Sequence, residues 1–405
     1  MIRITDPEIK VVIFGEHCWN TIGQIRSFGE VGVRPDVVFV STEPSSIERS
    51  KYINEFVRFE SFDEGLVHIR KKYGGKAKKI FISTDSDSIV SLLDKNYDAL
   101  KDDFIFFNAG EQGRLSSFMP KNVQGRLAES VGLRVPKSEI VKNGELPKTL
   151  NYPVFTKSLD CYVNNWKKDY YICQNEQMLI DAFKKINREE LLIQEFIEKK
   201  TEVALEGISF NGGENLYLPI QGEYLRTKPG LYGSWKLNEK YKLGEELKEK
   251  IQSMLKLVKY TGVFEVEFLK DKDDNLFFLE INFRHTQYNH ALTEMGANFG
   301  MIYLKSILNG YLCVDAKPLK SPSLVMNEVR DYSTYVETGE RSMIRWMLDL
   351  LLTRSFYVFD RNDDIRNDTE KTWRSNLIYF MERCDFNWLL KLFLFIKKTD
   401  LIFDI

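Results

Sequence analysis

The sequence predicts a chain of mixed α/β and α+β class, with an N-terminal parallel α/β domain, a central α+β region and a helix-rich C-terminal tail. Three observations support this. Strand and helix patterns alternate over about the first 115 residues, strand hairpins and a long amphipathic helix follow, and apolar helical stretches dominate after residue 316. A length of 405 residues suits two or three domains, and we place them at 1–115, 116–315 and 316–405.

Composition and charge narrow the class of protein. The chain is 43% hydrophobic and 29% charged with a net charge of −2, which is ordinary for a soluble protein and argues against a nucleic-acid partner. The five cysteines are scattered, which favours reduced thiols over disulfides or a zinc site. The chain shows no signal-peptide pattern and no run of the roughly 18 apolar residues that a membrane span needs. We therefore expect a cytoplasmic protein.

Four apolar runs predict the strands of the N-terminal sheet. They occupy residues 11–15, 36–41, 79–83 and 103–108, with helical patterns between them at 20–28, 61–73 and 87–96. This alternation is typical of a parallel sheet covered by helices. The loop at residues 15–17 follows the first strand, at the edge where such sheets bind ligands, but it is not a GxGxxG dinucleotide loop.

The central region has a different pattern. We expect helices at 121–130, 176–186, 243–260 and 298–308, and strands at 152–157, 191–196, 203–210 and 216–224. The last two strands meet at Asn-Gly-Gly, which is a strong hairpin turn signal. The helix at 243–260 carries its apolar residues at helical spacing, so one of its faces should be buried.

The most informative segment is a second predicted hairpin, at residues 263–284. A polar turn, DKDDN, separates its two apolar strands. Glu280, Asn282 and Arg284 alternate along the second strand and share one face, and ordinary register brings Glu267 of the first strand opposite Glu280. Two carboxylates and an amide oxygen are hard ligands that suit Mg²⁺. The alternative for this pattern is a surface hairpin with scattered charges, which we disfavour because such a hairpin has no need of Asn and Arg at these offsets.

Four upstream features fit a nucleotide site beside this hairpin. Lys157 ends an apolar strand, where its ammonium suits a phosphate. The segment 195–197 continues an apolar strand into a loop whose backbone groups suit the edge of a flat heterocycle. Glu202 lies seven residues after Glu195 and suits vicinal hydroxyls, and Lys121 offers a second cation.

In the order of these motifs, the sequence resembles the ATP-grasp superfamily over about residues 10–310. The resemblance implies a two-part nucleotide clamp that binds ATP and Mg²⁺. Lys157 would contact phosphate, Glu202 the ribose, and Arg284 the transferring phosphate. The remaining implied contacts are adenine by Glu195, Phe196 and Ile197, and magnesium by Glu267, Glu280 and Asn282.

The EINFR motif and the residues that follow it are most similar to the carboxylate–amine ligases of the D-aspartate ligase type. This branch implies a ligase that forms an amide through an acyl phosphate, with small-molecule carboxylate and amine substrates. On the acceptor side, Arg226 and Lys228 are candidates to face the carboxylate or γ-phosphate. His290 is a candidate proton acceptor, although a structural role is an equal alternative.

One departure from the family concerns the lid. Residues 158–168 carry no glycine, whereas many ATP-grasp members close a Gly-rich loop over the phosphates. Lys168 or its neighbour Lys167 would supply a cation in place of backbone amides. The departure leaves open a second hypothesis, a catalytically silent ATP-binding or scaffold protein of the same fold.

The tail contains two strongly apolar helical stretches, at 342–352 and 388–397. Both are too short to cross a bilayer. For the second stretch we favour packing on the body, or on a partner subunit in a homodimer, over an interfacial membrane helix.

Overall fold

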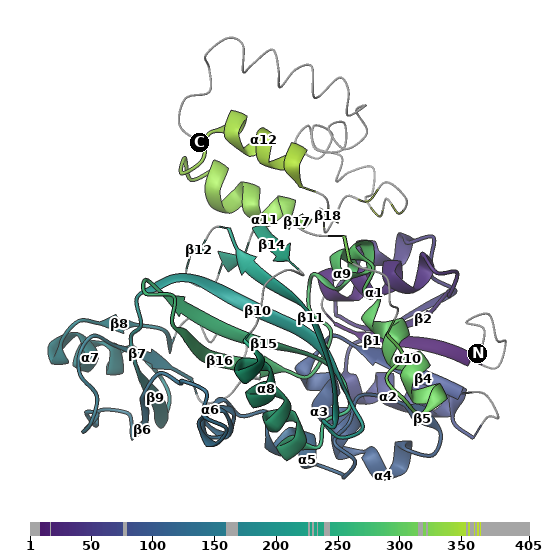
Figure 1. Cartoon of the computed structure of the whole chain (residues 1–405), viewed down its shortest axis with the longest axis horizontal. Helices are drawn as coiled ribbons and strands as arrows, with labels where there is room; N and C mark the ends of the chain where they lie inside the picture. Colours follow the sequence, from purple (N-terminus) through teal and green to yellow (C-terminus); the bar gives the residue numbers. More distant parts are fainter. Residues whose placement is uncertain are drawn as a thin grey trace.

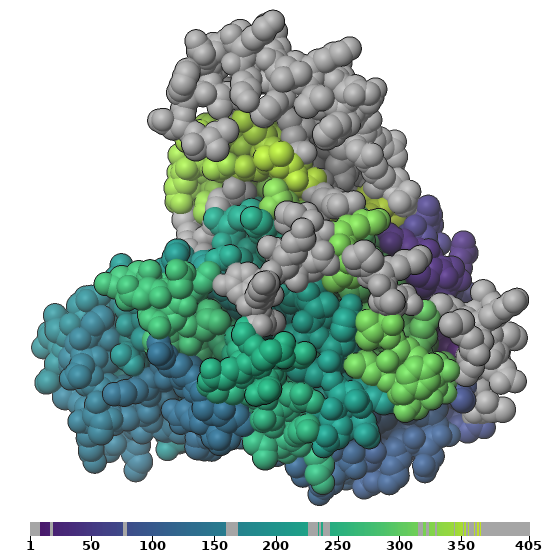
Figure 2. Space-filling view, viewed as in Figure 1, coloured from purple at the N-terminus to yellow at the C-terminus, as the bar shows by residue number. Residues whose placement is uncertain are grey.

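The computed structural model describes residues 9–16, 18–75, 79–158, 169–225, 227–228, 231–232, 234–238, 244–314, 319–320, 323–353, 355–356, 360, 363 and 365. Figure 1 shows a large sheet at the centre, the N-terminal domain on one side of it and a small sheet on the other. Two C-terminal helices project above the large sheet, and Figure 2 shows the same projection in space-filling form. The predicted order of a parallel sheet followed by an α+β region is confirmed.

The N-terminal domain holds a five-stranded parallel sheet in the order β3-β2-β1-β4-β5. Its strands are β1 (Ile9–Gly15), β2 (Asp36–Val40), β3 (Glu55–Phe59), β4 (Lys79–Thr84) and β5 (Phe104–Ile105). The helices α1 (Cys18–Gly29), α2 (Phe62–Tyr73) and α3 (Asp87–Lys95) are close to the predicted ones. Short elements complete the domain: η1 (Ser46–Arg49), α4 (Tyr97–Leu100) and α5 (Arg114–Ser117).

Two sequence-based expectations for this sheet were wrong. The edge strand β3 was not expected, since none of its residues is fully buried and its apolar signal is weak. The strand expected at 103–108 pairs with β4 only at Phe104 and Ile105. Beyond that pair the chain leaves the sheet, and Asn108 forms a bridge to Thr261 of the central region instead.

The large sheet has the order β16-β15-β10-β11-β14-β17-β18 and is antiparallel except at its β17–β18 end. Its strands are β10 (Lys199–Phe210), β11 (Asn215–Tyr224), β14 (Ser234–Asn238), β15 (Gly262–Asp271), β16 (Leu276–Asn282), β17 (Ser323–Met326) and β18 (Ser355–Phe356). A separate two-stranded ladder joins β12 (Thr227–Lys228) to β13 (Leu231–Tyr232). Both predicted hairpins, β10–β11 and β15–β16, are confirmed.

Helices α8 (Glu245–Val258), α9 (Asn289–Met295) and α10 (Phe299–Asn309) contribute to the main core. The buried face of α8 is the predicted apolar one. The Asn-Gly-Gly turn lies against this helix. Gly213 has φ +91, and a Cβ atom there would approach the Lys256 nitrogen to 2.4 Å, so this position requires glycine.

The small sheet has the order β6-β9-β7-β8, with α7 (Glu176–Phe183) packed on one face. Its strands are β6 (Ser138–Lys142), β7 (Val154–Lys157), β8 (Ile172–Cys173) and β9 (Glu190–Glu195). Strand β6 was not expected, because Val141 is its one fully buried residue. The opposite face of this sheet looks toward α6 (Lys121–Ser130) and β16, and a cleft lies between them.

The C-terminal projection consists of α11 (Glu328–Asp331), a π-helical turn (Tyr332–Val336) and α12 (Met343–Leu352). Trp346 anchors α12, since its buried indole donates to Asp331 Oδ2 over 3.0 Å. No helix in the described part of the chain is both long enough and apolar enough to cross a membrane. The apolar stretch at 388–397 lies outside the described residues.

Gln124 fastens α6 to the edge of the large sheet. Its buried amide donates to Ile281 O over 3.0 Å and to Met119 O over 3.1 Å, and it accepts from Ile281 N over 3.0 Å. Strand β16 is the outermost strand of the sheet, so these bonds satisfy backbone groups that no further strand covers.

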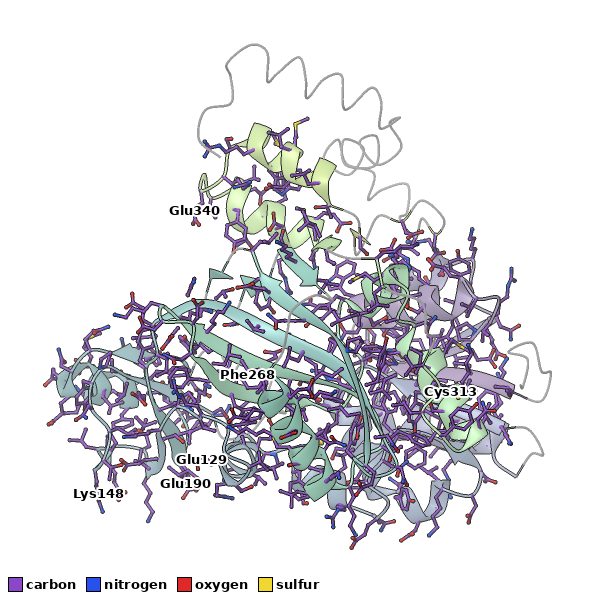
Figure 3. All side chains as sticks on the ribbon, viewed as in Figure 1. Glu129, Lys148, Glu190, Phe268, Cys313 and Glu340 are labelled. Atoms are coloured by element: carbon purple, nitrogen blue, oxygen red, sulfur yellow. The ribbon has the colours of Figure 1, made fainter. Side chains whose placement is uncertain are left out.

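We expect Gln124→Met to lower the free energy of unfolding by about 2 kcal/mol, because both backbone groups of Ile281 lose a buried partner. Urea denaturation followed by circular dichroism measures this change. Glu129→Gln, on the exposed part of the same helix and labelled in Figure 3, is the matched control and should stay within about 0.5 kcal/mol of the native protein. An unchanged free energy for Gln124→Met would contradict the role of this side chain.

Candidate functional site

The candidate site is organised by the register of three neighbouring strands. Glu267 of β15 pairs with Glu280 of β16, as predicted, and Glu265 pairs with Asn282. Phe268, the next residue of β15, pairs with Phe278, so Leu279 is left without a partner and forms a β-bulge. With this bulge, Glu267 and Glu280 pair although twelve residues separate them in the sequence. On the other side of β15, Glu206 of β10 pairs with Glu265. Cross-strand partners share a face of the sheet, so these polar groups form one cluster.

The two predicted carboxylate ligands have opposite electrostatic surroundings. Lys121 lies 3.1 Å from Glu280 and, despite burial, holds the pKa of that carboxyl below its ordinary value. For Glu267, burial and the neighbouring carboxyls Glu265 and Glu280 raise the pKa well above its ordinary value. The cluster therefore carries more negative charge than its described cations neutralise.

Residues of this cluster fit a magnesium site. Carboxylate oxygens of Glu267 and Glu280 and the amide oxygen of Asn282 are hard donors on one face. Burial, and then the neighbouring carboxyls, raise the pKa of Glu267, and a divalent cation at this face would offset that cost. The Asn282 Oδ1 atom accepts from Arg284 over 3.1 Å, so metal binding would replace or share that contact.

Arg284 is held from two domains. Its guanidinium forms a bidentate pair with Asp87, with Nε–Oδ1 at 2.9 Å and Nη2–Oδ2 at 3.1 Å. Asp87 is the first residue of α3, so the pair joins the N-terminal domain to the end of β16. Burial opposes the charge on Arg284, but Asp87 outweighs this and raises the pKa of the guanidinium further. Sequence reasoning missed Asp87, because nothing local links it to a residue about 200 positions away.

Two further carboxylates were also missed. Glu206 and Glu265 are both buried, and Glu206 accepts from the hydroxyl of Thr286. Glu265 accepts from Asn282 Nδ2 over 3.0 Å and from the phenol of Tyr288. Burial, and then the charge of Glu265, raises the pKa of Glu206 well above its ordinary value. The spacing of Glu265 and Glu267, two residues apart on one strand, was the signal that could have indicated the first of them.

Lys157 lies where the sequence predicted, at the end of β7 and facing the cleft. Its Nζ atom donates to Gln194 Oε1 over 2.9 Å. Burial, with a further contribution from Lys121, lowers the pKa of Lys157 to about 7. The cleft has a volume of about 330 Å³, and it is lined by Lys121 and Gly125 of α6, Ser138 and Ile140 of β6, Lys157, Leu192, Gln194, and Phe278 of β16. A nucleotide base and ribose are of the size that such a cleft accommodates.

The predicted hinge, residues 195–197, continues from β9 beside this cleft. Phe196 N donates to Pro153 O over 3.1 Å, which fixes the hinge to the start of β7. Among the described residues, no hydrogen bond to the N–H of Ile197 is found, so this amide is a donor available to a heterocycle. Glu202 pairs with Lys199 at 2.5 Å and is within electrostatic range of Lys157.

Of the remaining predicted residues, the structure describes the side chain of His290 alone. Arg226 and Lys168 lie outside the described residues, and for Lys228 the structure describes the backbone of β12 alone. His290 is buried on α9, and its Nε2 atom lies 2.7 Å from Glu30 Oε1, which follows α1. The hydrogen bond of His290 is thus with the N-terminal domain rather than with Arg284. This placement favours the structural alternative over proton transfer.

His285 also lies beside Arg284, in the core against Phe107. Burial lowers the pKa of its imidazole to about 3, so the ring is neutral. The backbone N–H of His285 donates a hydrogen bond to Thr84 O over 3.4 Å. This contact brings the residues after β16 to the carboxyl end of β4.

Comparison with known proteins gives distant relatives. No protein-family model matches the sequence. The chain is similar to N5-carboxyaminoimidazole ribonucleotide synthase of Staphylococcus aureus, with 24% identity over 181 residues, or 42% of this chain and 47% of that protein. It spans about half the length of the curated relatives it matches.

Solved structures share the fold over most of the chain. N5-carboxyaminoimidazole synthetase from Staphylococcus aureus has a TM-score of 0.60 and 17% identity, over 82% of this chain and 85% of that one. L-amino acid ligase from Bacillus licheniformis has a TM-score of 0.57 and 17% identity, over 82% and 77%. Biotin carboxylase from Campylobacter jejuni has a TM-score of 0.59 and 16% identity, over 78% and 74%. Together with the sheet order, these likenesses give the chain the ATP-grasp fold.

The lowered pKa of Lys157 predicts a specific pH dependence of stability. The pKa is about 7 in the folded protein and about 10.4 in an unfolded chain, so between these values the unfolded chain binds the extra proton. The free energy of unfolding therefore gains a contribution from Lys157 that rises with pH across this window. Lys157→Met should show a shallower rise between about pH 7.5 and 9.5 in urea denaturation. Lys148→Met, an exposed lysine labelled in Figure 3, should keep the native slope, and an unchanged slope in Lys157→Met would contradict the burial effect.

Proposed function

We propose that this chain is an ATP-dependent carboxylate–amine ligase that forms an amide through an acyl-phosphate intermediate. The observation that carries the proposal is the register that aligns Glu267 with Glu280 and places Asn282 and Arg284 beside them. Lys121 and Lys157 stand between this carboxylate face and the cleft of about 330 Å³. An anionic phosphate chain fits between these cations and a metal held by the carboxylates.

The nucleotide would lie with its adenine at the hinge and its phosphates toward Lys157 and Lys121. The N–H of Ile197, which donates to no described residue, supports a donor contact to the base, and Glu202 supports contacts to the ribose hydroxyls. The lowered pKa of Lys157 supports phosphate binding, because a nearby polyanion would return the ammonium to its charged form. Magnesium bound by Glu267, Glu280 and Asn282 would neutralise phosphate charge.

The chemistry would run in two steps. An oxygen of the substrate carboxylate attacks the γ-phosphorus of ATP, the bond from that phosphorus to the bridging oxygen breaks, and ADP leaves. An amine that arrives as an ammonium cation first loses one proton to solvent. Its neutral nitrogen then attacks the acyl carbon, the bond from that carbon to the phosphate oxygen breaks, and phosphate and the amide form with release of a second proton. Arg284, held rigid by Asp87, would stabilise the negative charge of the acyl phosphate through its planar donors.

The names of the similar proteins differ in reaction and substrate, and the name of one of them supports a ligation. One is a ribonucleotide synthase, another an L-amino acid ligase and a third a biotin carboxylase. We favour an amine and carboxylate of the amino-acid-ligase kind, because the EINFR motif has that character. The reaction uses ATP, so we retain the cytoplasm as the proposed location. A homodimer remains the proposed assembly.

A catalytically silent ATP-binding protein is the second candidate. The observation that favours it is the absence of glycine from residues 158–168, which leaves the phosphates without the usual backbone cover. The two candidates differ in phosphate release. A ligase releases phosphate from ATP when carboxylate and amine are both present, whereas a silent protein binds ATP and releases none.

We expect Glu280→Gln to reduce ATP-dependent phosphate release by at least about a hundredfold, because the carboxylate shared between the metal and Lys121 is lost. A coupled phosphate assay with purified protein, ATP and Mg²⁺ measures the rate, and circular dichroism checks the fold. Glu190→Gln changes an exposed carboxylate of β9, labelled in Figure 3, and should keep the native rate. A native rate of phosphate release in Glu280→Gln would contradict the proposed mechanism.

A further inference from the structure

The N-terminal sheet reverses its strand order between β1 and β4, since β2 and β3 lie on one side and β5 on the other. Ligands of such sheets bind outside the carboxyl ends of the strands at this switch point. Here that edge is acidic. Glu16 follows β1, Asp85 and Asp87 follow β4, and we call these three side chains the edge carboxylates.

The residues after β16 lie against this edge. Arg284 pairs with Asp87, and His285 N contacts Thr84 O. On their other side, Thr286 donates to Glu206. Glu206 and Glu265, which we call the inner carboxylates, lie opposite one another on β10 and β15. The segment 284–286 thus runs between two groups of acidic side chains.

Glu206 has an unmet bonding capacity. Its side chain is 0% exposed, and its Oε2 atom has no hydrogen-bond partner in the described part of the chain. A buried carboxylate oxygen without a partner costs free energy, so such an atom in a site points to a ligand that donates to it. Glu265, beside it, hydrogen-bonds with Glu267, which is partly exposed. The inner carboxylates therefore lie one side chain beneath the accessible face of the site.

We propose that the amine substrate binds as a primary ammonium cation, with an N–H donated to Glu206 Oε2 and with Glu265 as the second carboxylate of the subsite. This inference rests on the proposed ligase function and adds the charge class of the acceptor. The edge and inner carboxylates together supply five carboxyl groups, whereas Arg284 is the one cation among the described side chains of the subsite. The field of both groups therefore attracts a cation and repels an anion.

The same charges argue against a phosphorylated acceptor such as a ribonucleotide. A phosphate group needs donors and positive charge, and Arg284, the cation among the described side chains of the proposed subsite, already serves the acyl phosphate in the proposed mechanism. If the acceptor carried a phosphate group, the carboxylates of this subsite would face that anion at short range, which costs free energy. The chain thus differs in its proposed acceptor from the ribonucleotide synthase that it resembles.

The first experiment separates acyl-phosphate formation from amine recognition. Hydroxylamine is uncharged at neutral pH and captures acyl phosphates as hydroxamates, so it does not need an ammonium subsite. The native protein is screened with ATP, Mg²⁺ and hydroxylamine over amino acids, hydroxy acids and hexuronates as carboxylates. Absence of any hydroxamate counts against the proposed function, and the second experiment still tests the subsite.

With the carboxylate found in that screen, primary amines replace hydroxylamine. Glu206→Gln should raise KM for the amine by a factor at least about tenfold larger than the factor by which it lowers the rate of hydroxamate formation. Glu190→Gln should leave both unchanged. Equal loss of amide and hydroxamate formation in Glu206→Gln, or no change in KM for the amine, would overturn the subsite.

The second experiment measures binding without turnover. Ligand-observed NMR with ADP and Mg²⁺ compares L-alaninamide, which carries an ammonium, with lactamide, which has a hydroxyl in its place, and with ribose 5-phosphate. We expect the native protein to bind L-alaninamide and neither of the other two compounds. The affinity for L-alaninamide should fall at least about tenfold in Glu206→Gln and stay unchanged in Glu190→Gln. Binding of ribose 5-phosphate instead, no binding of L-alaninamide, or its displacement by K⁺ at millimolar concentration would overturn the proposal.

Glu206→Gln is isosteric and removes a buried charge, so the variant should fold. We expect its thermal midpoint to equal or exceed that of the native protein, since the amide is cheaper to bury than the carboxylate. Glu265→Gln, measured in the same NMR series, provides a second variant and should also weaken the binding of L-alaninamide. Unchanged binding in both variants would overturn the subsite.

Discussion

The register of β15 against β16, with β10 on its other side, is the constraint on which the rest of the site depends. Because Glu267 faces Glu280 and Glu265 faces both Asn282 and Glu206, one sheet face collects four carboxyl groups. A slip of one residue would send them to the opposite face, into the core around α8 and α10. The bulge at Leu279 sets this register, so a backbone irregularity determines the electrostatics of the site.

Three contacts transmit that register to the rest of the molecule. Gln124 holds α6, and with it Lys121, against the edge of β16. Arg284 and Asp87 join the end of the same strand to the N-terminal domain, and Thr286 reaches back to Glu206. Lys121, the carboxylates of the cluster and Arg284 are therefore positioned by a single hairpin. Buried charges of this kind are tolerated because each is paired or lies where a charged ligand would compensate it.

The acceptor side shows how one fold serves different reactions. The similar solved structures share the fold, and the names of the similar proteins describe different substrates. In the proposed function the nucleotide is held by residues that the family resemblance predicts, whereas Glu206, Glu265 and the edge carboxylates surround the proposed acceptor side with acidic groups. Function is carried by such local groups and not by the fold itself. In this chain they favour a cationic acceptor.

The sequence alone determined the features that depend on local pattern. Alternation on β16 predicted the shared face of Glu280 and Asn282, helical spacing predicted α8, and an apolar strand ending in lysine predicted Lys157 at the cleft. Contacts between residues far apart in the sequence were determined by the tertiary structure alone, because no local sequence pattern indicates which two residues will meet. Asp87 meets Arg284 through domain packing, and Glu206 meets Glu265 through the pairing of β10 with β15. Weakly apolar edge strands such as β3 and β6 were likewise decided by their neighbours, which supply the pairing that their own sequences do not indicate.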